Sequence, residues 1–167
     1  MDRPLWTFGP IAMPLEALAL IRSHAESTYP SECCGFGAGP AAIPELVDEV
    51  FPEVNEADRY HAIDPIRFPR TSRTYFKINE IRAQKLFKEA AARGRPIKLI
   101  YHSHCDAGDY FSAEDAATFV QEGVLTWPCA FLVVSVRNGC AVSERLWVHV
   151  EGSDRFEQAP LLIRSTY

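Results

Sequence analysis

The segment RPIKLIYHSH, residues 95–104, constrains the fold of this chain more than any other feature of its sequence. Its apolar run is typical of a buried strand, and the run ends in two histidines one residue apart. On a strand, side chains two residues apart share one face and lie roughly 6–7 Å from each other along the backbone. We therefore predict a strand that carries His102 and His104 on one face, where both imidazoles can converge on one metal ion.

A loop and a helix start follow this strand directly. Residues 105–111 form the loop, and Ser112 occupies the N-cap position of the next helix. Asp115 lies in the first helical turn, where its carboxylate can point back toward the loop and the two histidines. A His-His-Asp set with an open fourth position is typical of a catalytic rather than a structural zinc site. Ser112 and Asp115 alone would be an ordinary S-x-x-D helix start, so only the combined spacing is specific.

Patterning in the rest of the chain predicts both helices and strands, without a regular βαβ rhythm. Apolar periodicity and capping residues predict helices over residues 14–28, 78–94 and 112–123. Strands are predicted over residues 32–39, 45–54, 95–104, 129–136 and 140–150, with a short extended piece within RYHAIDPIRF, residues 59–68. Asn138-Gly139 marks a hairpin turn between the last two strands, and the tail 151–167 has an ambiguous pattern. We predict an α/β fold with a mixed β-sheet flanked by helices.

Composition narrows the class of protein. A length of 167 residues indicates a single domain spanning 1–167, and a net charge of −5 without a basic stripe argues against nucleic-acid binding. The longest apolar run, near CAFLVVSV, is too short to span a bilayer, so no membrane association is expected. An odd count of five cysteines without a signal peptide indicates reduced thiols, and we expect a cytoplasmic protein.

The motif and the segments around it resemble a known protein family. HSHCDAGDYFSAED, residues 102–115, resembles the H-S-H-x7-S-x2-D signature of the JAMM/MPN+ metalloproteases at every defining position. YPSECCGFGAG resembles the segment in which that family places a glutamate before a glycine-rich strand, and Glu32 falls on the glutamate. VFPEVNEADRYHAIDP resembles the family's strand pair with an intervening asparagine, and CAFLVVSVRNG its hairpin after the metal helix. The resemblance covers residues from about 12 to 150 and implies an MPN (JAB) fold.

The resemblance also implies a zinc-dependent hydrolase. The two histidines and Asp115 would bind Zn2+, and Glu32 would take a proton from water and return it to the leaving amine. Ser112 would stabilise the oxyanion of the tetrahedral intermediate, by its hydroxyl or through a nearby backbone donor. Ser103, between the histidines, should point to the opposite face of the strand as structural support.

Substrate expectations come from the same family. It cleaves peptide or isopeptide bonds after the C-terminal Gly-Gly tail of a ubiquitin-like protein, and a narrow groove beside the metal would hold that tail as an added strand. Only EGVLTWP separates the metal helix from the next strand, so the chain resembles compact prokaryotic members that trim residues, or release a cysteine adduct, from ubiquitin-like sulfur carriers. The alternatives are a deconjugating isopeptidase of a prokaryotic modification or defence system, a phage-tail or cell-wall peptidase, and a non-catalytic scaffold.

Several residues near the motif leave alternatives open. Cys105 stands where many family members have proline, and it is either a bystander, an extra metal ligand or an oxidation-sensitive group. Strand alternation predicts that one of Cys33 and Cys34 is buried and that the other faces the cleft. The basic loop, residues 69–77, is either a solvated linker or a docking surface for an acidic carrier.

Overall fold

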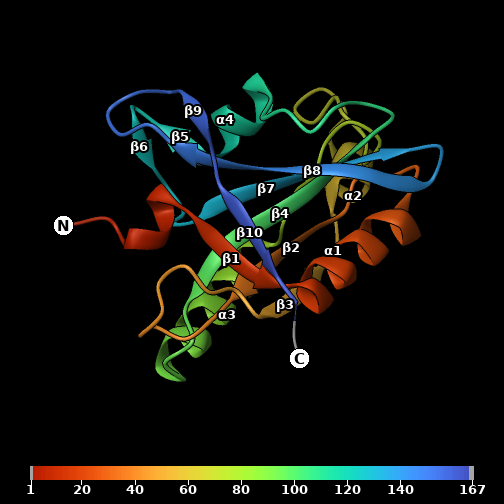
Figure 1. Cartoon of the computed structure of the whole chain (residues 1–167). Helices are drawn as coiled ribbons and strands as arrows, with labels where there is room; N and C mark the ends of the chain where they lie inside the picture. The colour runs from red at the N-terminus through yellow and green to blue at the C-terminus, as the bar shows by residue number, and fades with distance from the viewer. Residues whose placement is uncertain (1, 166–167) are drawn as a thin grey trace.

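The computed structural model describes residues 2–165 and contains a six-stranded mixed sheet (Figure 1). The strands run in the order β3-β2-β4-β7-β8-β9, and only β4 and β7 pair in parallel. Their bounds are β2 Cys34–Ala38, β3 Glu49–Glu53, β4 Ile97–Cys105, β7 Ala130–Arg137, β8 Cys140–His149 and β9 Phe156–Ala159. The predicted mixed sheet is therefore confirmed.

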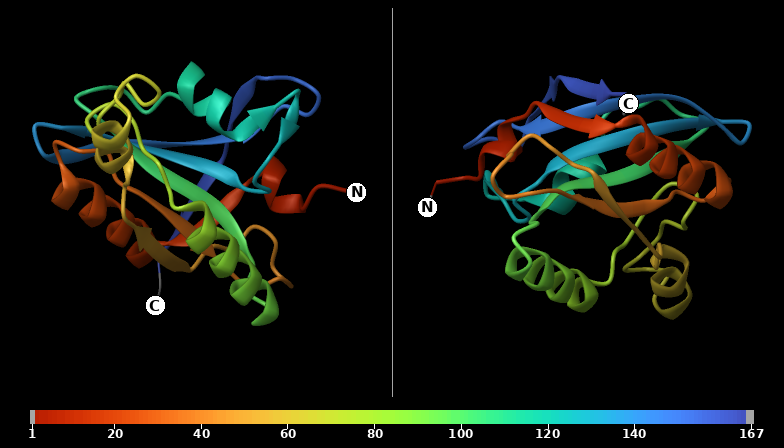
Figure 2. Two further views of the ribbon diagram at one scale, coloured as in Figure 1. Left: turned by 180° about the vertical axis from the view of Figure 1, so that it is seen from behind. Right: turned by 60° about the horizontal axis from the view of Figure 1, so that its bottom comes forward.

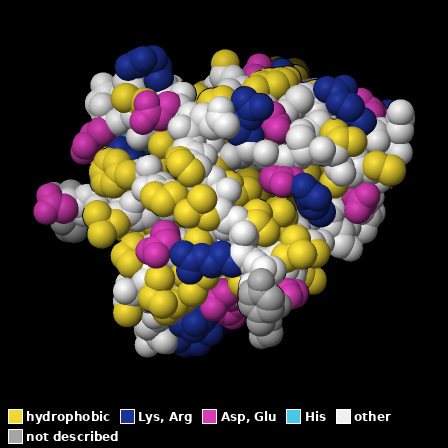
Figure 3. Space-filling model, viewed as in Figure 1, with side chains coloured by type: hydrophobic (Ala, Val, Ile, Leu, Met, Phe, Trp, Pro, Cys, Tyr) yellow, Lys and Arg dark blue, Asp and Glu magenta, His cyan; other side chains and the backbone are white. Residues whose placement is uncertain are grey.

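Helices and a small second sheet cover the two faces of this sheet (Figures 1 and 2). One face packs against helix α1 and the parallel pair β1 and β10, and the opposite face packs against α3 and α4. The bounds of these and the remaining elements are η1 Leu5–Phe8, β1 Ile11–Pro14, α1 Leu15–Thr28, α2 Ala57–Ile63, α3 Glu80–Ala92, α4 Ala113–Phe119, β5 Val120–Gln121, β6 Val124–Leu125 and β10 Leu161–Arg164. Figure 3 views the face with η1, β1 and β10, where apolar side chains (yellow) lie among scattered charges.

Strand β4 is the central element of the sheet. It lies between antiparallel β2 and parallel β7, and its side chains alternate between the two apolar clusters on either face. Tyr101 points into the cluster beside α1, where its hydroxyl bonds Nδ1 of His24 at 2.8 Å. Gly35 lies opposite Tyr101 on β2, and a Cβ atom there would lie 2.4 Å from the tyrosine ring. Glycine at this position therefore makes room for the tyrosine side chain.

Two predicted segments differ in the structure. Residues 59–68 were expected to be extended, but α2 occupies Ala57–Ile63, because the side chain of Asn55 accepts the Ala57 N–H and starts a helix there. The helix predicted to reach residue 123 ends at Phe119, and β5 and β6 follow it as a tight hairpin. Glu122 and Gly123 both have positive φ at its turn, so this glycine serves a hairpin and not a helix end.

Two strands near opposite ends of the chain pair with each other in the second sheet. The ambiguous tail contains β9 and β10, and β10 pairs in parallel with β1, a strand that the sequence did not reveal. Both strands have four residues, which is too short for a clear pattern. Among residues 2–165, the helices are too short or too polar to cross a membrane.

Lys98 is a fully buried cation at the start of β4. Its ammonium donates to the carbonyl oxygens of Pro40, Ile43 and Leu46 at 2.7–2.9 Å, in the loop between β2 and β3. These three bonds use every donor of the group. Burial lowers the pKa of Lys98 to about 8, so the side chain is still mostly protonated at neutral pH. The lysine thereby fixes the loop against the central strand.

We expect Lys98→Met to destabilise the protein. Methionine keeps the apolar stem of the side chain but removes the three bonds from the buried ammonium. The Pro40 and Ile43 carbonyls keep the backbone N–H groups of Ile43 and Leu46, whereas the Leu46 carbonyl loses its donor. This loss should lower the free energy of unfolding by about 2–4 kcal/mol. Urea denaturation monitored by circular dichroism measures the change. Lys85→Met, on the exposed face of α3, is the matched control and should change stability by less than about 0.5 kcal/mol. Equal denaturation midpoints for the two variants would contradict this role of Lys98.

Candidate metal centre

Two histidines of β4 and one aspartate of α4 meet at the end of the central strand. Nε2 of His102 lies 3.2 Å from Nε2 of His104, and Oδ2 of Asp115 lies 3.1 Å and 3.3 Å from these two atoms. The three atoms thus form a nearly equilateral triangle. Each of these side chains is buried. The predicted convergence of His102, His104 and Asp115 is present in the structure.

The triangle fits a tetrahedral metal ion. Zinc ligands at about 2.0–2.1 Å from the ion in tetrahedral geometry lie about 3.3–3.4 Å from one another. Nδ1 of His104 lies 2.8 Å from the carbonyl oxygen of Gly108, which can only accept, so this nitrogen carries a proton. Burial lowers the pKa of His104, but the bond and the charge of Asp115 raise it overall and favour a second proton on Nε2. A metal cation would take the place of that proton between Nε2 and the carboxylate.

His102 is oriented by an aromatic contact. Its ring stacks on Phe76 with centroids 4.4 Å apart and an angle of 24° between the planes. Its Nδ1 is buried and bonds no other described residue. Stacking and burial in β4 therefore hold this imidazole, whereas a hydrogen bond holds that of His104.

Asp115 serves the helix and the metal centre with the same oxygen. Oδ2 accepts the backbone N–H of Ser112 at 3.0 Å, and the Ser112 hydroxyl accepts the N–H of Asp115 at 3.0 Å, which together form a capping box. Burial acts to raise the pKa of Asp115, but the charge of His102 and the bonds from the two histidines and Ser112 lower it overall. The carboxylate is therefore ionised where the two imidazoles meet it.

Glu32 lies beside the histidines, just before β2. One carboxylate oxygen of Glu32 and one nitrogen of each histidine all lie within 4.8 Å of one another, and the three could hold a metal ion. Burial raises the pKa of Glu32 to about 8; the charge of His104 opposes this rise and that of Asp115 adds to it. Glu32 is thus next to the predicted ligands, while Asp115 approaches them more closely.

Asn55 is a site-building residue that the sequence marked only through the family resemblance. Its amide nitrogen donates to the carbonyl oxygens of Glu32 and Tyr75 at 2.9 Å, and its oxygen accepts the N–H groups of Ala57 and Lys77 at 3.0 Å. These four bonds use the full capacity of the amide. Asn55 thereby joins the backbone at Glu32 to α2 and to the segment before α3.

Ser103 supports the same region from the other face of β4. Its hydroxyl accepts the N–H of Cys33 at 2.7 Å, directly after Glu32. The predicted outward orientation of Ser103 from the histidines is confirmed, because Cys33 belongs to the apolar cluster beside α1. The position of Glu32 is therefore fixed through the next residue along the chain.

The cysteines near the centre do not face a cleft. Cys33 and Cys34 are both fully buried, one in each apolar cluster, so the prediction that one faces the cleft is wrong. Strand alternation places Cys34 on the same face of the sheet as the histidines. On that face Cys34 belongs to the same buried apolar cluster as Phe36 and Ile100, so it is not exposed to a cleft. Burial raises the pKa of Cys105 to about 11, which keeps it a thiol at neutral pH and disfavours the extra-ligand alternative.

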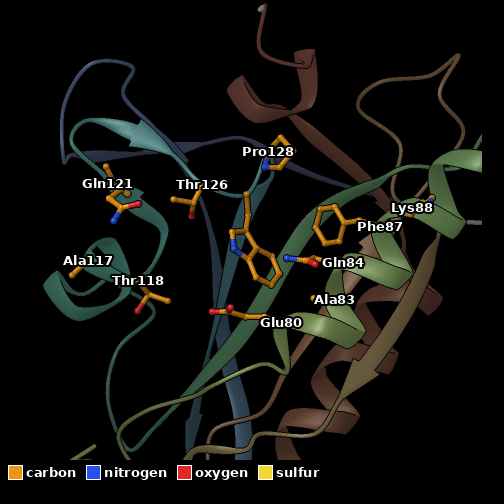
Figure 4. A pocket seen from close by; sticks show the side chains of 12 residues that line it. Glu80, Ala83, Gln84, Phe87, Lys88, Ala117, Thr118, Gln121, Thr126 and Pro128 are labelled. Atoms are coloured by element: carbon orange, nitrogen blue, oxygen red, sulfur yellow. The ribbon is translucent and has the colours of Figure 1, made fainter. Parts of the chain in front are cut away.

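Two adjoining clefts lie on the α3 side of the sheet, and no residue of the metal centre lines them. The larger, about 740 Å³, lies between α3 and the segment from α4 to β5, with Gln84 and Phe87 facing Thr118 and Gln121 (Figure 4). The smaller, about 50 Å³, shares Trp127, Glu80 and Thr118 with it and reaches Phe76, the ring on which His102 stacks. No sequence pattern indicated either cleft, because residues from four separate segments line them.

Solved structures share the fold. The solution structure of a protein from Desulfitobacterium hafniense matches this chain with a TM-score of 0.67 at 17% identity, with 94% of each chain covered. A solution structure from Salinibacter ruber has a TM-score of 0.61 at 23% identity, with 92% of each chain covered. The crystal structure of a JAB1/MPN domain protein from Archaeoglobus fulgidus has a TM-score of 0.54 at 14% identity, covering 93% of this chain and 99% of that one. These likenesses show the fold alone.

Sequence comparison defines the family. A search of curated proteins found no match. Residues 14–150 match the family described as prokaryotic homologs of the JAB domain. The match spans most of the chain and contains every residue of the candidate metal centre, and the fold is that of the JAB1/MPN domain. This chain therefore belongs to the prokaryotic homologs of the JAB domain.

Proposed function

We propose that this protein is a zinc-dependent peptidase that cleaves the bond after the C-terminal glycine of a ubiquitin-like protein, and that its substrate is a prokaryotic sulfur carrier. The observation that carries the proposal is the buried triangle of His102, His104 and Asp115, 3.1–3.3 Å on each side, with Glu32 beside it. The reaction consumes one water: its hydroxyl goes to the glycine carbonyl carbon and its proton to the leaving amine. The carrier identity rests on the resemblance to compact prokaryotic members.

The residues of the centre have distinct tasks in this reaction. A zinc ion held by the two histidines and Asp115 would supply a Lewis acid and make hydroxide available near neutral pH. The positive charge of that ion would lower the pKa of Glu32 from about 8, so that its carboxylate could receive the proton of the attacking water and pass it to the amine. The Ser112 hydroxyl oxygen accepts the Asp115 N–H, which leaves the hydroxyl proton free to bond the developing oxyanion.

The two adjoining clefts support a path for the carrier's tail. The larger cleft would receive the chain before the glycines. The smaller cleft ends at Phe76, whose ring stacks on His102, so the tail would have to pass this ring to reach the metal centre. Glycines have the least bulk to pass there, which is consistent with a substrate that ends in Gly-Gly.

Two alternatives to this proposal are a non-catalytic scaffold and a deconjugating isopeptidase. A scaffold has no need for three converging donor atoms, whose burial without a partner is costly. A deconjugating isopeptidase would use the same centre and would differ in its leaving group. The structure has all five cysteines free, which is consistent with the cytoplasmic location we propose.

Substitution of Glu32 should separate metal binding from catalysis. Glu32→Gln removes the proton acceptor but no ligand of the triangle, so we expect about one zinc per chain and a loss of hydrolysis of about 10²–10⁴-fold. His102→Ala should lose both zinc and hydrolysis. Mass spectrometry of the metal and cleavage of a sulfur carrier extended past its Gly-Gly measure the two properties. Glu151→Gln, on an exposed loop, should match the unsubstituted protein, whereas an active Glu32→Gln protein would rule out this base.

Filling the larger cleft should impair recognition of the carrier. Ala117 lies on α4 and lines the cleft, so Ala117→Trp should lower kcat/KM for the whole carrier by at least about tenfold, which is about 1.4 kcal/mol. Cleavage of a short Gly-Gly peptide, which does not occupy the cleft, should change little. Ala91→Trp places the same ring on an exposed position of α3 outside the cleft and serves as the control. Equal carrier kinetics in the two variants would refute the path.

A further inference from the structure

An ion pair joins helix α4 to the loop before α3. One guanidinium nitrogen of Arg70 donates to the Glu114 carboxylate at 3.0 Å, and another donates to the carbonyl oxygen of Thr74 at 3.2 Å. Glu114 directly precedes the predicted ligand Asp115 on α4, whereas Arg70 lies in the loop that contacts Glu32. The pair therefore links the two sides of the centre.

The loop that carries Arg70 is anchored to the backbone of Glu32. The carbonyl oxygen of Ser72 accepts the Glu32 N–H at 2.7 Å. Ser72 in turn donates from its backbone N–H and its hydroxyl to the Asp58 carboxylate, at 2.7 Å and 2.8 Å. Arg70 stands two residues before Ser72, so it belongs to a loop that is fixed directly against the proposed base.

Arg70 has donors to spare. Only two of its five N–H groups are engaged within residues 2–165, and its side chain is 43% exposed. A planar guanidinium fork binds carboxylates in a bidentate manner. Its partner Glu114 is 50% exposed, and an ion pair this open contributes little stability and is readily exchanged. A carboxylate of the substrate could therefore replace Glu114.

We propose that Arg70 is a specificity-determining residue that binds the free α-carboxylate of a single amino acid attached to the carrier's terminal glycine. This inference rests on the proposed function and names its leaving group. In such a substrate the carboxylate lies two bonds from the scissile nitrogen, next to Glu32. Water adds its hydroxyl to the glycine carbonyl carbon and its proton to the nitrogen, the C–N bond breaks, and one free amino acid leaves; nothing is oxidised or reduced.

An isopeptide substrate lacks this group. When the scissile nitrogen is a lysine side-chain amine, four methylenes follow it and no carboxylate stands at this position. The arrangement thus favours release of one residue over removal of the carrier from a protein.

The test compares three forms of one sulfur carrier: extended by a single residue as the free acid, by the same residue as its amide, and linked through its glycine to a lysine side-chain amine. We expect the zinc-loaded protein to cleave the free acid about 10–100-fold more efficiently than the amide, as for other charge-assisted contacts. Arg70→Ala should abolish this preference by raising KM for the free acid alone, with zinc content unchanged.

Two further variants sharpen the result. Arg67→Ala removes the same charge from the same exposed loop, and it should keep the preference for the free acid. Glu114→Gln frees Arg70 from its partner and should lower KM for the free acid by a few-fold. Equal cleavage of acid and amide by the unsubstituted protein would overturn the role of Arg70 and leave the proposed peptidase intact. Cleavage of none of the three would overturn both.

Discussion

Convergence of three donor atoms in a buried space is the constraint around which the site is built. Two imidazole nitrogens and a carboxylate oxygen lie within 3.3 Å of one another, so one cation could bind all three. Each side chain is also held by a contact elsewhere: the ring of His104 by the Gly108 carbonyl, that of His102 by Phe76, and Asp115 by the capping box. A preorganised set of this kind binds a cation without reorganising.

The position of Glu32 depends on backbone contacts. Its own N–H and carbonyl bond Ser72 and Asn55, and the N–H of the next residue bonds the hydroxyl of Ser103. Three segments that are distant in sequence thus fix one short stretch of chain before β2. A carboxylate that must accept and release a proton at one place benefits from this rigidity, because a displacement of about 1 Å at a reacting centre can cost about 10²-fold in rate.

Local rules predicted the metal triangle but not the structure that supports it. Strand alternation placed His102 and His104 on one face, and the N-cap spacing placed Asp115 in the first turn, because both rules act within a few residues. The helix α2 was missed because the role of Asn55 depends on Tyr75 and Lys77, some twenty residues further along. Pairing of β1 with β10 joins the two chain ends, and no local pattern indicates such a contact.

Helix α2, which the sequence did not predict, and the residues just before it also position two other segments at the site. Asn55, just before α2, holds Tyr75 and Lys77 and so places Phe76 against His102, at the end of the clefts. Asp58, within α2, holds Ser72 and so places Arg70 opposite Glu114. One anchored segment therefore supplies both the aromatic ring that packs on His102 and the cation that pairs with Glu114. The substrate that we propose, with an uncharged glycine tail and a terminal carboxylate, would match these two groups, with its scissile bond at the metal centre.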